Sequence, residues 1–370
     1  MRRSNPFVVL TAVLLLALTV GIPGFNLGGV THAQDNTPTP TAEPTLPTVA
    51  SGALPAEITL TLAGFAVPRE AYAEIIPLFQ QEWENKTGQK VSFQESYQAS
   101  GAQSRAIVGG FKADVAALSL ESDITRIAKA NLITHDWKDT PYKGIVSASV
   151  AVLAVRPGNP KNITGWADLA REGIEIITPN PATSGGAQWN LLAVYGAAKR
   201  GKVEGVEADE ESAFAFLSKV ISNISVLDKD GRESFLSFER GIGDVAITYE
   251  NEVYAGLAKG GEYEIIYPTS TILIENPIVY IDVYVDENGT RPAAEAFVNF
   301  TLTEAAQRIF AKHGFRPLIP ELLTEPEIAA KFPVIQDVFT IEEFGGWSMV
   351  AKELFGEEGK ISQLLISIKG

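Results

Sequence analysis

The stretch EIITPNPATSGGAQWNLLAVYGAAKRG, residues 175–201, joins a short apolar run to a helical pattern through small residues. The run 175–178 predicts a strand, and Ser184, Gly185 and Gly186 stand where the helix begins. The apolar positions that follow have helical spacing: Leu191, Leu192, Val194 and Tyr195. A helix start carries backbone N–H groups without intrahelical partners and a partial positive charge. This junction therefore predicts an α/β unit whose helix start can bind an anion.

The same alternation of strand and helix patterns runs through most of the chain. Short β-branched runs, typical of strands, occur at 58–62, 90–93, 114–118, 150–156, 175–178, 244–249 and 264–267. Segments with helical spacing separate these runs. The pattern predicts an α/β fold with a largely parallel sheet.

Three further expected strands also lead into a helix start. Pro68 follows Ala66 after the first strand, Ser100 opens a Ser-x-x-Gln capping box after the second, and Gly231 opens a fourth start. Serine and glycine are ordinary cap residues, so one such start alone indicates no ligand. In open α/β sheets, however, ligands bind at the carboxyl ends of strands. Four starts of this kind therefore predict a shared anion site.

Composition limits the partners and the chemistry of the chain. It has 370 residues, 45% of them hydrophobic, which is enough for one large domain or two lobes with their own cores. The net charge is −15, so neither nucleic acid nor an anionic lipid surface is an expected partner. There is no cysteine, which excludes disulfides and lipid attachment to cysteine. An anion site in such a chain has to be local and built from dipoles.

The first residues predict an export signal, residues 1–33. Arg2 and Arg3 precede an apolar stretch at 7–20, and Thr31, His32 and Ala33 resemble a cleavage site. Residues 34–56 are rich in Thr and Pro and predict an extended, disordered tether. The alternative is an uncleaved segment that anchors the chain in the membrane. Both interpretations place the folded part outside the cytoplasm, in the periplasm or another extracytoplasmic space.

Several motifs, in this order along the chain, resemble the periplasmic sulfate-binding protein family. They are ESYQASGAQS (95–104), VRPGNPKNITGWADL (155–169), ITPNPATSGGAQWN (177–190), FERGIGDVAITYENE (238–252), GFRP (314–317) and FGGW (344–347). The resemblance implies a type II periplasmic-binding-protein fold, in which two α/β lobes joined by crossing strands surround a central cleft. It divides the chain into lobe 1 (57–145), lobe 2 (146–248) and a return to lobe 1 with C-terminal helices (249–370).

The resemblance also implies a function and a set of ligands. The chain would be the non-enzymatic binding component of an ABC importer, a monomer that delivers sulfate or thiosulfate to a membrane permease without any cofactor. The ligand residues carried over from the motifs are the backbone N–H groups of Ser100, Gly185, Gly186 and Gly231, and the hydroxyl of Ser184.

Two positions depart from the family pattern. Ala66 stands where the family has an Asp that binds through its backbone N–H, so the donor survives. Tyr249 stands where the family has a Trp that donates from its indole. A phenol is shorter in reach and can also accept, and the related molybdate-binding family uses a Tyr in a comparable role. Molybdate and phosphate therefore remain alternative ligands.

A site that offers only donors favours sulfate over hydrogen phosphate. Sulfate carries no proton at neutral pH, whereas the proton of hydrogen phosphate needs an acceptor, and an unpaired buried polar group costs about 1 to 3 kcal/mol. Asp228, Asp230 and Glu250 lie near the expected site in the sequence, with orientations that the sequence leaves open. Arg232 is expected either to steer the anion or to lie solvated on the surface.

An enzyme is the second hypothesis, a hydrolase or transferase with Ser184 or Ser100 as nucleophile. The chain has no Gly-x-Ser-x-Gly elbow, and beyond the signal only His135 and His313 offer an imidazole base. We expect His135 on the surface and no metal site, because no His, Asp or Glu cluster has ligand spacing. The tryptophans that we expect to pack rather than to bind a ligand are Trp83, Trp137, Trp166 and Trp347.

Overall fold

A computed structural model describes residues 54–369. The predicted signal peptide and residues 34–53 of the predicted tether lie outside the described residues. The helices and strands in chain order are β1 (Glu57–Phe65), α1 (Arg69–Thr87), β2 (Lys90–Gln98), α2 (Ser100–Val108), β3 (Val115–Ala117), α3 (Glu121–Lys129), β4 (Ile145–Val155), η1 (Trp166–Ala170), β5 (Ile176–Pro179), α4 (Gly185–Lys199), α5 (Glu210–Ser222), β6 (Ile224–Asp228), α6 (Gly231–Glu239), β7 (Val245–Tyr249), α7 (Glu250–Leu257), β8 (Glu264–Ile266), β9 (Ser270–Tyr280), α8 (Asp282–Asn288), α9 (Arg291–Phe300), α10 (Glu304–Lys312), η2 (Pro320–Thr324), α11 (Pro326–Lys331), β10 (Asp337–Phe339), η3 (Ile341–Phe344), α12 (Gly346–Glu353) and α13 (Lys360–Lys369).

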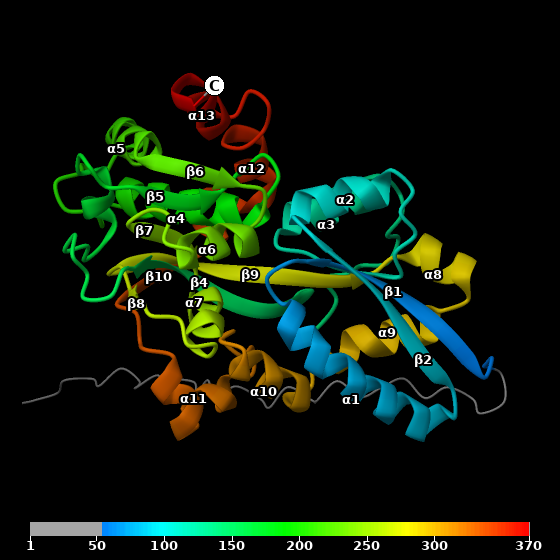
Figure 1. The fold of residues 1–370 in the computed structure, drawn as a ribbon. Coiled ribbons are helices and arrows are strands. Elements are labelled where there is room, and N and C mark those ends of the chain that lie inside the picture. The colour runs from blue at the N-terminus through cyan, green and yellow to red at the C-terminus, as the bar shows by residue number, and fades with distance from the viewer. Residues whose placement is uncertain (1–53, 370) are drawn as a thin grey trace, which may run out of the picture. The chain divides into compact units, whose positions relative to one another are not determined.

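The strands follow the order β2-β1-β3-β9-β4-β7-β5-β6, with β10 beside β9 and β8 beside β4. The pairs β1–β2, β1–β3, β5–β6 and β5–β7 are parallel. The central pairs β3–β9, β4–β9 and β4–β7 are antiparallel. The prediction of a largely parallel sheet therefore holds for the outer strands and is wrong for the centre. The reason is that β4 and β9, each 11 residues long, run between two groups of strands (Figure 1).

The seven predicted strands are all present, but β6, β9 and β10 were not predicted. The strand β9 is central and almost wholly buried. Its middle contains Glu275, Asn276 and Pro277, which interrupt the apolar pattern that identifies a strand. Asn276 is fully buried, so this polar residue lies inside the sheet and not in a loop.

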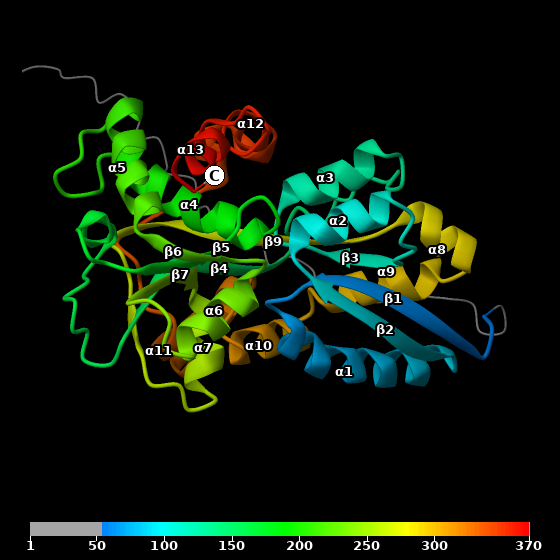
Figure 2. The ribbon, with the colours of Figure 1, turned by 45° about the horizontal axis from the view of Figure 1, so that its top comes forward.

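Each group of strands has its own packing. On the first group, α1 and α9 meet through aromatic side chains, with Phe79 and Phe297 ring centroids 5.1 Å apart. On the second group, α4 is buried along almost its whole length. The C-terminal α13 packs against α5, and Lys369 Nζ donates to the Ile224 carbonyl at 2.6 Å. Figure 2 shows α12 and α13 beside α4 and α5. The C-terminal helices therefore cover the second group.

The tryptophans expected to pack do so at three of the four positions. Trp83, Trp166 and Trp347 are at most 3% exposed, and Trp137 is half-buried beneath Lys138. A fifth, Trp189, is fully buried and donates from Nε1 to the Ser119 carbonyl at 3.0 Å. Trp189 thus links α4 to the segment that follows β3.

Candidate anion-binding site

Five segments from both groups of strands meet around one small cavity. Six predicted ligand residues line it: Ala66, Ser100, Ser184, Gly185, Gly186 and Gly231. The other lining residues are Phe65, Val67, Gln98, Ala99, Ser119 and Asp230. The empty space is only about 220 Å³, with the open mouth included. The cavity therefore suits a small, compact ligand.

Three helices begin at the cavity. Ser100 is the first residue of α2, Gly185 of α4 and Gly231 of α6, so their N–H groups lack partners one turn earlier in the helix. Ala66 lies before α1, which begins at Arg69. Helix starts add partial positive charge, and this arrangement offers donors to an anion without any cationic side chain among the lining residues.

The Ser100 side chain does not form the predicted capping box. Ala99 occupies the cap position, while Ser100 Oγ donates to Asp123 Oδ2 at 2.6 Å and accepts from the Ser119 N–H at 2.9 Å. The Gln103 amide turns to the Gly64 and Ser96 carbonyls. The capping-box prediction is therefore wrong, because tertiary partners of Ser100 and Gln103 replaced the local ones. Ser100 is still the first residue of α2, so its N–H has no partner within the helix.

Ser184 caps α4 as predicted. Its Oγ accepts from the Ala187 N–H at 3.4 Å, which leaves the hydroxyl proton free to donate elsewhere. At Gly185 an added Cβ would lie 2.7 Å from Leu120 Cγ, so packing as well as ligand access requires glycine. An added Cβ at Gly186 would lie 3.5 Å from Ser184 Oγ and 3.7 Å from Tyr249 Oη, which are ordinary contact distances. The side-chain position of Gly186 therefore borders the cavity.

Tyr249 is not among the residues that line the cavity, but its Oη would lie 3.7 Å from a Cβ on Gly186, which does line it. The phenol is 3% exposed, and its Oη lies 2.8 Å from Ser119 Oγ. Burial raises the pKa of Tyr249 well above its usual value, so the phenol keeps its proton. Its partner Ser119 is one of the lining residues. Sequence reasoning missed Ser119, although its place directly after a predicted strand was a signal.

One of the three carboxylates with open orientation lines the cavity. Asp230 caps α6, and its Oδ1 accepts from the Glu233 N–H at 2.9 Å. Glu250 points elsewhere and pairs with Arg316 at 2.7 Å. Asp228 Oδ1 accepts from Ser237 at 3.1 Å, and Asp228 is also absent from the lining. The lining is therefore dominated by donors but includes one acidic side chain.

Arg232 is neither a ligand in the cavity wall nor a solvated residue. Its side chain is 17% exposed, and Nη2 lies 2.8 Å from Glu70 Oε2 on α1, in the other group of strands. Lys259 Nζ reaches the same carboxylate at 2.8 Å. Arg232 also lies 3.4 Å from Glu252, whose oxygens are buried without hydrogen-bond partners. Burial raises the pKa of Glu252 to about 7.

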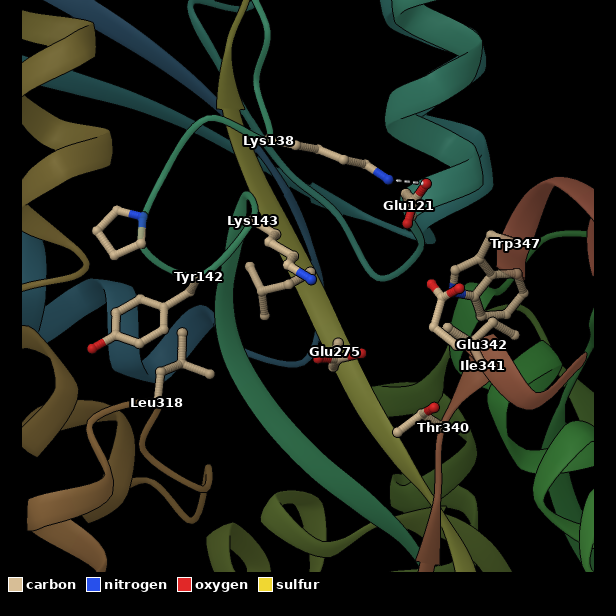
Figure 3. Close-up of a pocket in the computed structure, with 12 residues that line it drawn as sticks. Glu121, Lys138, Tyr142, Lys143, Glu275, Leu318, Thr340, Ile341, Glu342 and Trp347 are labelled. Atoms are coloured by element: carbon tan, nitrogen blue, oxygen red, sulfur yellow. Dashed lines mark hydrogen bonds and ion pairs between the residues drawn. The ribbon is translucent and has the colours of Figure 1, made fainter. Parts of the chain in front are cut away.

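A larger hollow, with about 1020 Å³ of empty space, lies elsewhere in the molecule (Figure 3). Three carboxylates line it, those of Glu121, Glu275 and Glu342. Burial raises the pKa of Glu275, and repulsion from Glu342 and Glu121 adds to this effect. Two lysines also line the hollow: Lys138 is paired with Glu121 at 2.5 Å, and Lys143 lowers the pKa of Glu275. With three carboxylates against two lysines, the wall is negative overall, and the hollow is less suited to an anion than the small cavity despite its size.

The groups needed for serine catalysis are not at the cavity. His135 Nδ1 lies 2.7 Å from Asp282, and its ring stacks on Tyr280 at 3.9 Å, so it is half-buried and not on the surface as expected. His313 Nε2 lies 2.8 Å from Glu74. Neither histidine lines the cavity. Among residues 54–369, no group of three or more His, Asp or Glu is arranged to hold a metal.

A family model for bacterial extracellular solute-binding proteins matches residues 60–316. The chain therefore belongs to the bacterial extracellular solute-binding proteins, and the resemblance to the sulfate-binding protein family drawn from its motifs is confirmed. Within residues 54–369 no helix combines the length and apolar character needed to cross a membrane.

Named relatives and a solved structure extend over most of the chain. The sulfate-binding protein of Synechococcus elongatus is 43% identical, over 86% of this chain and 90% of the relative. The thiosulfate-binding protein of Pseudomonas aeruginosa is 33% identical, over 85% of this chain and 94% of the relative. The solved sulfate-binding protein SubI from Mycobacterium tuberculosis is 38% identical, with a TM-score of 0.72. The matched region covers 81% of this chain and 100% of the SubI chain. The predicted periplasmic-binding fold is thereby confirmed.

Proposed function

We propose that this chain captures sulfate outside the cytoplasm and delivers it to the membrane permease of an ABC importer. The observation that carries this proposal is that α2, α4 and α6 begin at one small cavity without a cation in its wall. Relatives named for sulfate binding and similar over most of the chain support the choice of anion.

The proposed ligands are the N–H groups of Ala66, Ser100, Gly185, Gly186 and Gly231, and the Ser184 hydroxyl. A hydrogen bond to a charged group contributes about 1.5 to 3 kcal/mol. Several such bonds have to replace the hydration shell of a dianion and offset the cost of bringing the lobes together. The half-buried pair between Arg232 and Glu70 joins the two lobes near the cavity and supports the closed arrangement.

The donors also define the expected selectivity. A hydrogen phosphate proton would need an acceptor. The one carboxylate in the lining, Asp230, caps α6 by accepting from the Glu233 N–H at Oδ1, and we propose that it serves this helix and not the anion. Thiosulfate is the second candidate, supported by the relative named for thiosulfate binding. Molybdate is less favoured, because the Tyr249 phenol that suggested it is paired with Ser119 Oγ and is not among the lining residues.

We also propose that the chain works as a monomer without turnover. Ser184 and Ser100 have no imidazole base among the residues that line the cavity. The proposed boundaries are 57–145 for lobe 1, 146–248 for lobe 2 and 249–370 for the return to lobe 1 with the C-terminal helices. If the signal were uncleaved, the tether would hold the folded part near the membrane. The segment after Tyr249 then contributes to both lobes, because α13 packs on α5.

Competition calorimetry tests this proposal. Protein that begins at Gln34 is titrated with sulfate, thiosulfate, molybdate and phosphate, and the same samples are assayed for hydrolysis of ester and phosphoester substrates. We expect one site per chain, with sulfate bound at least as tightly as thiosulfate and far more tightly than phosphate, and no turnover. Phosphate ranked first, or turnover abolished by Ser184→Ala, would overturn the proposal.

A further inference from the structure

Ser119 is a buried residue of the cavity wall that is held by several hydrogen bonds. It is fully buried, and its N–H donates to Ser100 Oγ at 2.9 Å. Its carbonyl accepts from Trp189 Nε1 at 3.0 Å and from Asn276 Nδ2 at 3.1 Å. The backbone of Ser119 is therefore saturated, and only its hydroxyl is left to act in the cavity.

The hydroxyl of Ser119 is paired with that of Tyr249. Their oxygens are 2.8 Å apart, so one of the two protons lies between them and the other needs a separate acceptor. Tyr249 is buried and does not line the cavity, and the hydroxyl partner within its reach is Ser119 Oγ. Either hydroxyl can be the donor in this pair; when the phenol donates to Ser119 Oγ, the Ser119 proton is left for an acceptor in the cavity.

Asn276 holds the Ser119 backbone from β9. Its Oδ1 accepts from Ser147 Oγ at 3.3 Å, and its Nδ2 donates to the Ser119 carbonyl at 3.1 Å. Asn276 therefore helps to fix the position of Ser119 in the cavity wall.

We propose that the Ser119 hydroxyl is a direct donor to the bound anion, that Tyr249 is a positioning residue that orients this proton by donating to Ser119 Oγ, and that Asn276 holds the Ser119 backbone in place. This inference rests on the proposed function and adds one donor to its ligands. Ser119 then supplies the side-chain donor that the resemblance implies at Tyr249.

Two single variants and their combination test the inference by calorimetry. Ser119→Ala is expected to weaken sulfate binding about 10- to 100-fold, as for a lost bond to a charged group. Tyr249→Phe is expected to weaken it less, because Ser119 keeps its hydroxyl but loses its orientation. In the Ser119→Ala background, Tyr249→Phe is expected to have no further effect on affinity. A further loss in that background would show that Tyr249 contacts the anion itself and would overturn the inference.

Controls separate the inference from a change of fold and from the proposed function. Ser149 is an equally buried serine whose Oγ donates to Asn251 at 3.1 Å, and Ser149→Ala is expected to keep wild-type affinity. Ser119→Cys fills the same space with a weak donor and is expected to lose affinity as Ser119→Ala does, with an unchanged melting temperature of the free protein. If the wild type fails to bind sulfate, the proposed function is wrong. If the wild type binds and Ser119→Ala binds equally well, only the inference is wrong.

Discussion

The buried carboxylate of Glu252 makes a pH-dependent contribution to stability that one substitution should remove. It is 1% exposed, and both of its oxygens lack hydrogen-bond partners. Burial is the main reason why its pKa is raised to about 7; repulsion from Glu70 and Glu239 adds to this, and Arg232 and Lys259 oppose it. The folded protein therefore binds a proton more tightly at Glu252 than the unfolded chain does.

The sign and size of the effect follow from this difference in pKa. With an unfolded value of 4.5 and a folded value of about 7, the free energy of unfolding falls as pH rises between these values and is flat above them. One unit of pKa corresponds to about 1.4 kcal/mol. Glu252→Gln, which mimics the protonated acid, should thus gain about 2 to 3 kcal/mol over the wild type between pH 5 and pH 8.5.

Urea unfolding of the ligand-free protein at several pH values measures this gain. Glu358→Gln, at an exposed position, is the control and should follow the wild-type curve at every pH. If the stabilities of Glu252→Gln and the wild type stay parallel from pH 5 to pH 8.5, the reasoning that burial raises the Glu252 pKa is refuted.

Three further substitutions test other parts of the account. Gly186→Val should abolish sulfate binding in calorimetry, because the valine side chain enters the cavity. Gly165→Val is the control and should bind normally, because Gly165 lies in extended backbone with open space around it. Retained binding by Gly186→Val would show that the start of α4 is not part of the site. Glu70→Gln should weaken sulfate binding about 2- to 5-fold, since a half-exposed ion pair with Arg232 contributes only about 0 to 1 kcal/mol. A loss above 100-fold would mean that the pair does more than join the lobes. Glu275→Gln should leave sulfate affinity unchanged and raise the melting temperature at pH 8, because burial and like charges oppose ionisation there; a lower melting temperature would contradict this.

Much of the fold could be predicted because seven strands carry a clear β-branched pattern. The strand β9 could not be predicted, because the partners of its polar residues and of Pro277 are distant in the sequence. Asn276 donates to the Ser119 carbonyl, and the Pro277 carbonyl accepts from the Leu118 N–H at 3.0 Å. Two antiparallel pairs of the centre, β3–β9 and β4–β9, were missed with this strand. The third, β4–β7, joins two predicted strands, but the residue pattern of a strand does not show its direction relative to a neighbour.

Most of the candidate site could also be predicted, because six of its residues stand at strand ends or helix starts where backbone N–H groups are unpaired. The capping box failed because Ser100 has a side-chain partner far away in the sequence: its Oγ bonds Asp123 instead of capping its own helix. The contact of Tyr249 with the anion stays a prediction, and its Oη lies 2.8 Å from Ser119 Oγ. A motif shows which residue occupies a position. Whether the Tyr249 phenol contacts a ligand, as an indole would, depends on the side chains packed around it.

The most direct test of the account is a crystal structure with selenate, an analogue of sulfate whose selenium is located by anomalous scattering. The account predicts one selenate between the first residues of α2, α4 and α6, with its oxygens within hydrogen-bonding distance of the Ser100, Gly185 and Gly231 N–H groups and no cationic side chain in contact. Selenate bound elsewhere, or held directly by Arg232 or Lys259, would contradict it.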